Sequence, residues 1–140
     1  MANITKKTAL RAARDFMKFV DASPSPYHVV QECKDRLLCA GFREVKQSSG
    51  NWNVKPMEKL FMTKNQTSII ACAVGGNYVS GNGFTMLGAH TDSPCPRLKV
   101  VSKRLKEKYL QVGVECYGGG SWPSWFDRDL KVILFRFCCG

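Results

Sequence analysis

The hydrophobic positions of the first forty residues recur at helical spacing and predict two amphipathic helices. In the first, from Asn3 to about Ala22, the apolar positions lie three or four residues apart, at Leu10, Ala13, Met17 and Val20. A basic amphipathic helix can lie on a membrane surface, but this apolar face is narrow, and core packing is the favoured role. We predict a second helix with Ser25 as N-cap and Pro26 as its first residue, ending at Gly41. Its expected buried residues are Val29, Val30, Cys33 and Leu37.

After Gly41 the pattern changes to short runs that are typical of β-strands. Turn-forming residues, Ser48-Ser-Gly-Asn51, Asn65-Gln66 and Gly75-Gly-Asn77, separate them. The expected strands are Phe42–Val45, Lys59–Thr63, Ser68–Val74 and Phe84–Ala89. Ile69–Val74 and Met86–Ala89 are the most apolar runs, which is typical of central, buried strands. Two helices followed by several strands predict an α/β layered domain.

The last third of the sequence combines a basic stretch, another strand and an aromatic loop. Arg97–Lys108 holds six basic residues in twelve, and Tyr109–Tyr117 alternates as a strand does. We expect Gly118-Gly-Gly120 to permit a turn or a close backbone approach. Trp122, Trp125 and Phe126 should anchor the following loop in apolar surface, beside a structural charge network of Asp127, Arg128 and Asp129.

Composition and charge narrow the class of protein. The 140 residues are 44% hydrophobic, which indicates a globular domain, and the net charge is +10. Nucleic acid, anionic membrane and acidic peptides are therefore possible partners. Nucleic acid is disfavoured because no aromatic residue is interleaved with the basic residues of 97–108. The start of the chain lacks the apolar core of a secretory signal, and no run approaches membrane-spanning length, so we expect a cytoplasmic protein without a membrane partner. Seven scattered cysteines then indicate buried free thiols.

The chemistry is expected at His90 and Asp92. The apolar run Phe84–Ala89 should deliver His90 from the interior of the sheet into a loop that Pro94 ends. A neutral imidazole is a common metal ligand, and its second nitrogen usually donates to a carboxylate that fixes its orientation, which Asp92 could supply. The alternative is a histidine satisfied at a strand end, with Asp92 capping a turn. No nucleotide-binding glycine motif is present.

Several longer motifs resemble the aspartyl aminopeptidase family of zinc metallopeptidases. These are Gly88–Cys95, Val114–Trp122, Trp125–Asp129, Ser23–His28, Trp52–Pro56, Val74–Tyr78 and Gly81–Phe84. They occur in the family's order and at similar spacing, up to about Leu130.

The resemblance implies an enzyme that removes acidic residues, Asp or Glu, from peptide N-termini with two bridged zinc ions. His90 matches the first zinc-binding histidine, and Asp92 matches the catalytic-site aspartate that supports this ligand. The resemblance further implies that residues 1–100 begin the proteolytic α/β domain and residues 101–130 begin an inserted oligomerisation domain of a homo-oligomer. Residues 131–140 are a tail unlike the family.

The remaining ligands of the family, and its catalytic glutamates, lie downstream of Asp129 and have no counterpart here. Catalytic zinc sites use three protein ligands, so we expect this chain to hold no zinc pair and to cleave no peptide by itself. The alternative function is a non-catalytic fragment that binds the full-length enzyme or anionic partners.

Overall fold

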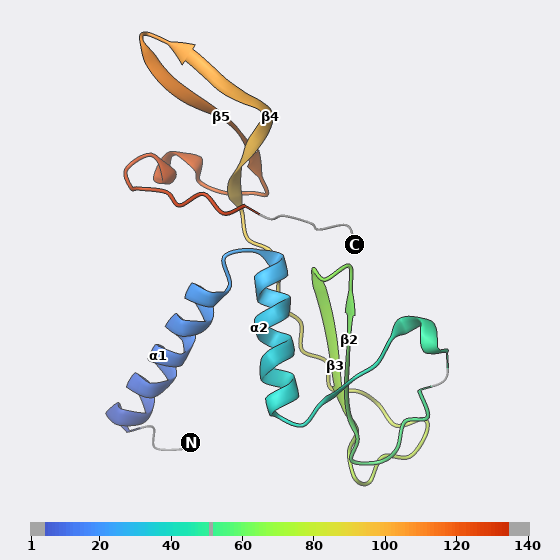
Figure 1. Ribbon diagram of the computed structural model, residues 1–140. Coiled ribbons are helices and arrows are strands. Elements are labelled where there is room, and N and C mark those ends of the chain that lie inside the picture. Colours follow the sequence, from blue (N-terminus) through green and yellow to red (C-terminus); the bar gives the residue numbers. More distant parts are fainter. Residues whose placement is uncertain (1–4, 51, 135–140) are drawn as a thin grey trace. The chain divides into compact units, whose positions relative to one another are not determined.

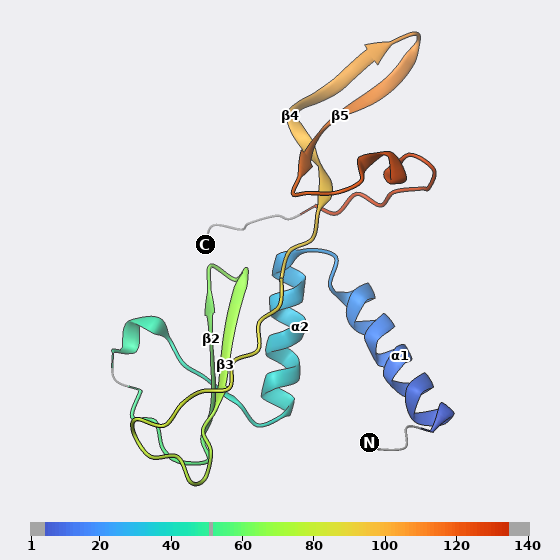
Figure 2. The same cartoon turned by 180° about the vertical axis from the view of Figure 1, so that it is seen from behind.

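The computed structural model describes residues 5–50 and 52–134. It divides into two compact units, Met1–Asp92 and Ser93–Gly140 (Figures 1 and 2). The first unit contains two helices and a three-stranded sheet, and the second contains a long β-hairpin and a 3-10 turn. The predicted α/β class is confirmed.

The two helices of the first unit are α1, Lys6–Ala22, and α2, Pro26–Cys39. The Ser25 side chain accepts a hydrogen bond from the backbone N–H of His28, and Pro26 occupies the first turn, so the predicted start of α2 is confirmed. Gly41 adopts a φ of +80°, the left-handed conformation expected just beyond the helix end. Val30 is buried, whereas Val29, Cys33 and Leu37 are half-buried.

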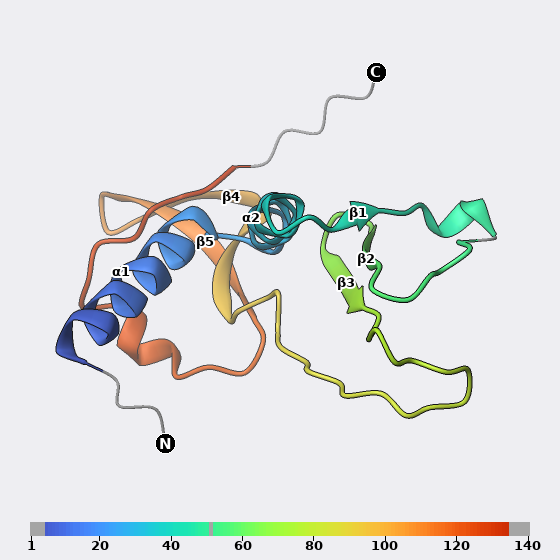
Figure 3. The same cartoon turned by 90° about the horizontal axis from the view of Figure 1, so that it is seen from below.

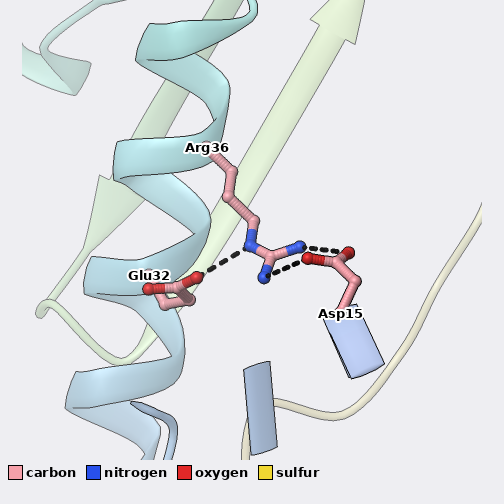
Figure 4. Close-up of polar contacts among 3 residues, drawn as sticks. All are labelled: Asp15, Glu32 and Arg36. Atoms are coloured by element: carbon pink, nitrogen blue, oxygen red, sulfur yellow. Dashed lines mark hydrogen bonds and ion pairs between the residues drawn. The ribbon is translucent and has the colours of Figure 1, made fainter. Parts of the chain in front are cut away.

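Arg36 links the two helices (Figure 4). Its guanidinium donates to Glu32 one turn earlier in α2, with Nε 2.8 Å from Oε1, and to Asp15 of α1, with Nη1 3.1 Å from Oδ2. The same group lies 5.2 Å from the centroid of the Phe19 ring. The hydrogen bonds that Arg36 donates to these two carboxylates, chiefly the one to Glu32, raise the pKa of Arg36 above its ordinary value. The cation therefore holds its charge while it joins α1 to α2.

The apolar residues of α1 do not form the core that the sequence pattern predicts. Leu10, Met17 and Val20 are each at least half exposed, and α1 has no buried residue. The prediction of core packing is wrong for this structure because, apart from α2, no element of the first unit makes more than slight contact with α1. Amphipathic spacing specified the helix and its face but not the surface that would cover that face.

The sheet of the first unit has the order β1-β2-β3 (Figure 3). Its strands are β1, Arg43–Glu44, β2, Lys59–Lys64, and β3, Ser68–Ala73. β1 pairs parallel with β2, and β2 pairs antiparallel with β3 through a turn at Asn65 and Gln66, which both have positive φ. Consecutive residues Leu60 and Phe61 are both buried, so β2 is covered on both faces. With Val30 and Val45 they are the buried hydrophobic residues of the described chain.

Two strand predictions are wrong. The central strand is β2, and β3 lies at the edge of the sheet with Ile70 67% exposed. Phe84–Ala89 forms no strand: after β3 the chain continues as an open, extended segment, in which Leu87 is 97% exposed (Figure 3). A strand requires backbone partners, and within the described residues this segment has no ladder with a neighbour.

The second unit is built on a hairpin of β4, Cys95–Lys106, and β5, Tyr109–Tyr117. Gly118 has a φ of +83°, and a side chain there would lie 3.3 Å from Pro94, so the predicted turn and close approach are confirmed. The 3-10 turn η2, Trp122–Trp125, half-buries both tryptophans. Phe126 is 84% exposed, so its anchoring role is wrong, and no ion pair joins Asp127, Arg128 and Asp129 within the described residues.

Three further predictions concern cysteines, membrane spans and the tail. Cys33, Cys39, Cys72, Cys95 and Cys116 are free thiols as expected, but none is buried, and Cys138 and Cys139 lie outside the described residues. Among the helices that the structure describes, none has the length and apolar character needed to cross a membrane. Of the predicted tail, 131–140, residues 135–140 lie outside the described part.

Candidate functional site

The site predicted from the sequence lies at the end of the first unit, in the loop Gly88–Asp92. These residues line a shallow surface pocket. The structure brings His90 and Asp92 together: Nδ1 of His90 lies 2.9 Å from Oδ1 of Asp92. The His90 side chain is 89% exposed and that of Asp92 is 38% exposed. The expectation that His90 emerges from a buried strand is wrong, since the segment before it is itself exposed.

The hydrogen bond between the two residues determines what His90 can bind. With the carboxylate as acceptor, Nδ1 carries the hydrogen, and the lone pair of the neutral imidazole lies on Nε2. Carboxylate support of this kind fixes the tautomer and orientation of a ligating histidine. The exposed Nε2 is therefore suited to bind a metal ion or to accept a proton.

Thr91 anchors the loop between these two residues. Its hydroxyl donates to the backbone carbonyl of Thr67, with Oγ1 2.7 Å from the oxygen, and so ties the loop to the turn between β2 and β3. Sequence reasoning gave Thr91 no role, although it lies within the motif Gly88–Cys95, because its partner is 24 positions away and no pattern marks Thr67. Thr91 sets the position of the backbone from which His90 and Asp92 project.

The described residues do not complete a metal site. Within 5–50 and 52–134, no group of three or more His, Cys, Asp and Glu side chains could hold a metal ion. His28, the other histidine, lies in the first turn of α2, where its Nδ1 is 3.0 Å from Oγ of Ser25. His90 fits zinc as one nitrogen ligand, whereas a catalytic site takes three protein ligands. The chemistry present is thus one oriented imidazole with its carboxylate.

Relatives and solved structures resemble this chain over most of its length. It is 51% identical over 122 residues to an aspartyl aminopeptidase of Caenorhabditis elegans, a match that covers 87% of this chain and 26% of the relative. In the Ape4 and Nbr1 complex determined by cryo-EM, the matched chain is 46% identical with a TM-score of 0.79, covering 87% of this chain and 23% of that one. The Saccharomyces cerevisiae mApe1 dodecamer is 30% identical, with a TM-score of 0.71 over 84% of this chain and 28% of that one.

The chain spans about a quarter of the length of the curated relatives that it matches. Residues 19–134 match the family model described as aminopeptidase I zinc metalloprotease (M18). This match includes His90, Asp92 and the whole β4–β5 hairpin. The chain belongs to the aminopeptidase I zinc metalloprotease (M18) family.

Proposed function

We propose that this chain is part of a zinc aminopeptidase that releases acidic residues, Asp or Glu, from peptide N-termini. Family membership supports the aminopeptidase activity, and the names of relatives at about half identity, aspartyl aminopeptidases, support the acidic preference. The observation that carries the proposal is the His90–Asp92 hydrogen bond, which leaves the metal-binding nitrogen exposed.

In this proposal His90 is a zinc ligand through Nε2. Asp92 is the catalytic-site carboxylate that holds the imidazole in the required tautomer and orientation, and it binds no metal itself. A pair of zinc ions, when bound, would polarise the scissile carbonyl and activate a water molecule. Thr91 is a positioning residue, because its bond to Thr67 holds the loop that carries both groups.

The remaining features of the proposal concern the larger protein. In this proposal residues 1–100 belong to the proteolytic α/β domain and residues 101–130 begin an inserted oligomerisation domain, although β4, Cys95–Lys106, crosses that boundary. Residues 131–140 form the tail called unlike the family, of which 131–134 lie within the family match. We further propose a cytoplasmic location and a homo-oligomer, and the dodecameric structure of a relative supports the homo-oligomer. The 140-residue chain alone is inactive, because His90 and Asp92 supply one ligand and its support and catalysis requires a complete metal site.

The test is zinc content together with hydrolysis of a peptide with an N-terminal aspartate. We expect neither stoichiometric zinc nor turnover from the 140-residue chain. A longer protein that continues this sequence in frame should show both and should lose both with His90→Ala. Asp92→Asn should lower zinc affinity or activity by about 10- to 100-fold, as removal of a ligand's hydrogen-bond partner does.

The outcomes separate the parts of the proposal. Turnover by the 140-residue chain that His90→Ala abolishes would contradict the claim of an incomplete site. A longer protein that retains zinc and turnover with His90→Ala would contradict the assignment of His90. Faster cleavage of a peptide with an N-terminal leucine than of the aspartyl peptide would contradict the acidic preference.

A second function, a non-catalytic fragment that binds the full-length enzyme or anionic partners, has its own support. Many large apolar side chains of the described chain are exposed, among them Leu105, Leu110 and Val112 of the hairpin. Such side chains favour association with another protein. Co-purification of the 140-residue chain with a full-length relative, lost with Leu110→Lys, would support binding to the enzyme, whereas a chain that elutes alone would exclude it.

A further inference from the structure

The β4–β5 hairpin has two chemically different faces. Residues directly opposite one another across an antiparallel pair project to the same face. Pairing of Leu98 with Val114, and of Leu105 with Leu110, places apolar side chains on one face. Pairing of Arg97 with Glu115, Arg104 with Gln111 and Lys106 with Tyr109 places polar and basic side chains on the other.

An irregularity in β4 brings the basic residues together. The register shifts between Leu98 and Lys103, so that even-numbered Arg104 and Lys106 join odd-numbered Arg97 on one face. Lys99 reaches the same face, because a Cβ built on Gly113 would lie 3.8 Å from Lys99 Cδ. We call Arg97, Lys99, Arg104 and Lys106 the basic face. Lys103, opposite Val112, projects from the apolar face.

The same face carries two aromatic rings from β5, those of Tyr109 and Tyr117. Tyr109 is 72% exposed beside Lys106, and the Arg97 guanidinium from β4 covers the Tyr117 ring, 3.5 Å from its centroid. Aromatic rings and guanidinium planes are the surfaces on which unpaired bases stack. The basic stretch lacked interleaved aromatic residues in the sequence, but β-pairing supplies them from the neighbouring strand.

We propose that the basic face of the β4–β5 hairpin binds single-stranded nucleic acid. Lys99, Arg104 and Lys106 contact phosphates, while bases stack on Tyr109 and on the Arg97 plane. From Tyr109 to Tyr117 the strand extends about 27 Å at about 3.4 Å per residue, which suits a site of a few nucleotides. The exposed flat groups favour unpaired bases over an acidic peptide, whose carboxylates need only the cations. This inference is independent of the proposed peptidase activity.

The test measures binding of a fluorescent oligothymidylate of about 10 nucleotides to the 140-residue chain by anisotropy, at several salt concentrations. Arg104→Ala combined with Lys106→Ala should weaken binding and make the negative slope of log affinity against log salt shallower by about 1.4, or ~0.7 for each lost phosphate contact. Lys103→Ala, which removes one cation from the apolar face, is the matched control and should leave the slope unchanged.

Tyr109 tests stacking. Tyr109→Ala should weaken binding by about 5- to 150-fold, whereas Tyr109→Phe, which keeps the ring, should bind as the unchanged chain does. Glu115→Gln removes the carboxylate opposite Arg97 and should strengthen binding, a gain that misfolding would not produce.

Three results would overturn the proposal. One is a loss of affinity with Lys103→Ala equal to that with the double variant Arg104→Ala and Lys106→Ala. Another is tighter binding to polyglutamate or to duplex DNA than to the single strand. The third is an unchanged affinity with Tyr109→Ala in a chain whose circular dichroism is unaltered.

Discussion

Two hydrogen bonds hold the Glu58 carboxylate of the first unit. Its side chain accepts from the Arg43 guanidinium and, 3.0 Å away, from the backbone N–H of Lys55. These two bonds, the Arg43 bond first, lower the pKa of Glu58 below its usual value near 4.5. The bonds fix β1 to the segment that enters β2.

We predict that Glu58→Gln removes part of the pH dependence of stability. A carboxyl with a depressed pKa in the folded state contributes stability above about pH 4.5, and this contribution is lost as pH falls through the depressed value. The variant should therefore have a lower urea midpoint than the unchanged chain at about pH 7, and the difference should shrink at about pH 3. Glu107→Gln, in the hairpin turn, controls for the change in net charge. An equal difference at both pH values would contradict the prediction.

Features set by a few neighbouring residues were predictable from the sequence. Ser25 caps α2, and Gly41 and Gly118 adopt positive φ, because hydroxyl capping and left-handed backbone depend on local chemistry. The spacing of His90 and Asp92 likewise placed both side chains within hydrogen-bonding reach. The Thr91–Thr67 bond was not predictable, since it depends on how two distant segments pack.

At the scale of elements, β2 contributes buried residues to the core, whereas the segment before His90, Phe84–Ala89, contributes none. Phe61 is 1% exposed and Phe84 is 76% exposed, although both lie in apolar runs that predict strands. Burial of a phenylalanine contributes several kcal/mol to folding, whereas an exposed ring contributes little.

We predict that Phe61→Ala lowers the free energy of unfolding by about 3–5 kcal/mol, or prevents folding of the first unit. Phe84→Ala is the matched control and should change it by less than about 0.5 kcal/mol. If Phe61→Ala does not fold, Phe61→Leu should lose less stability and still give a measurable free energy of unfolding. The measurement is urea unfolding followed by circular dichroism, and similar effects at both positions would show that Phe84 is buried in solution.

Whether a segment forms a helix or a strand was predictable from periodicity, but which strands pair with one another was not. The pattern indicated both helices, β2, β3 and β5 because local spacing reflects one buried or exposed face. It assigned β3 to the centre and Phe84–Ala89 to a strand because an apolar run does not reveal which strand pairs with it. The register shift in β4 was equally hidden, and it determines which basic residues share a face.

At the scale of the whole chain, the described core is small and confined to the first unit. Val30, Val45, Leu60 and Phe61 are its buried hydrophobic residues, and none of them belongs to the hairpin. This chain spans about a quarter of the length of the relatives that it matches, and a longer chain buries a larger fraction of its surface on folding. Within the described residues, no group of three or more His, Cys, Asp and Glu side chains could hold a metal ion.

The two units should therefore differ in local stability, which amide hydrogen exchange measures. In a dilute solution of the 140-residue chain, we expect the amides of β2 to be protected, because its backbone is paired on both sides and Leu60 and Phe61 are buried. The amides of β4 and β5 should exchange faster than those of β2, because a two-stranded hairpin with an exposed apolar face is less stable than a three-stranded sheet with a buried core. If the apolar face of the hairpin associates, raising the chain concentration should slow amide exchange in the hairpin. Leu110→Lys, on that face, should abolish this concentration effect, whereas Gln111→Lys, on the basic face, should leave it unchanged. Hairpin protection equal to that of β2 and independent of concentration would show that the second unit is stable by itself, and it would remove the reason to expect a partner for the apolar face.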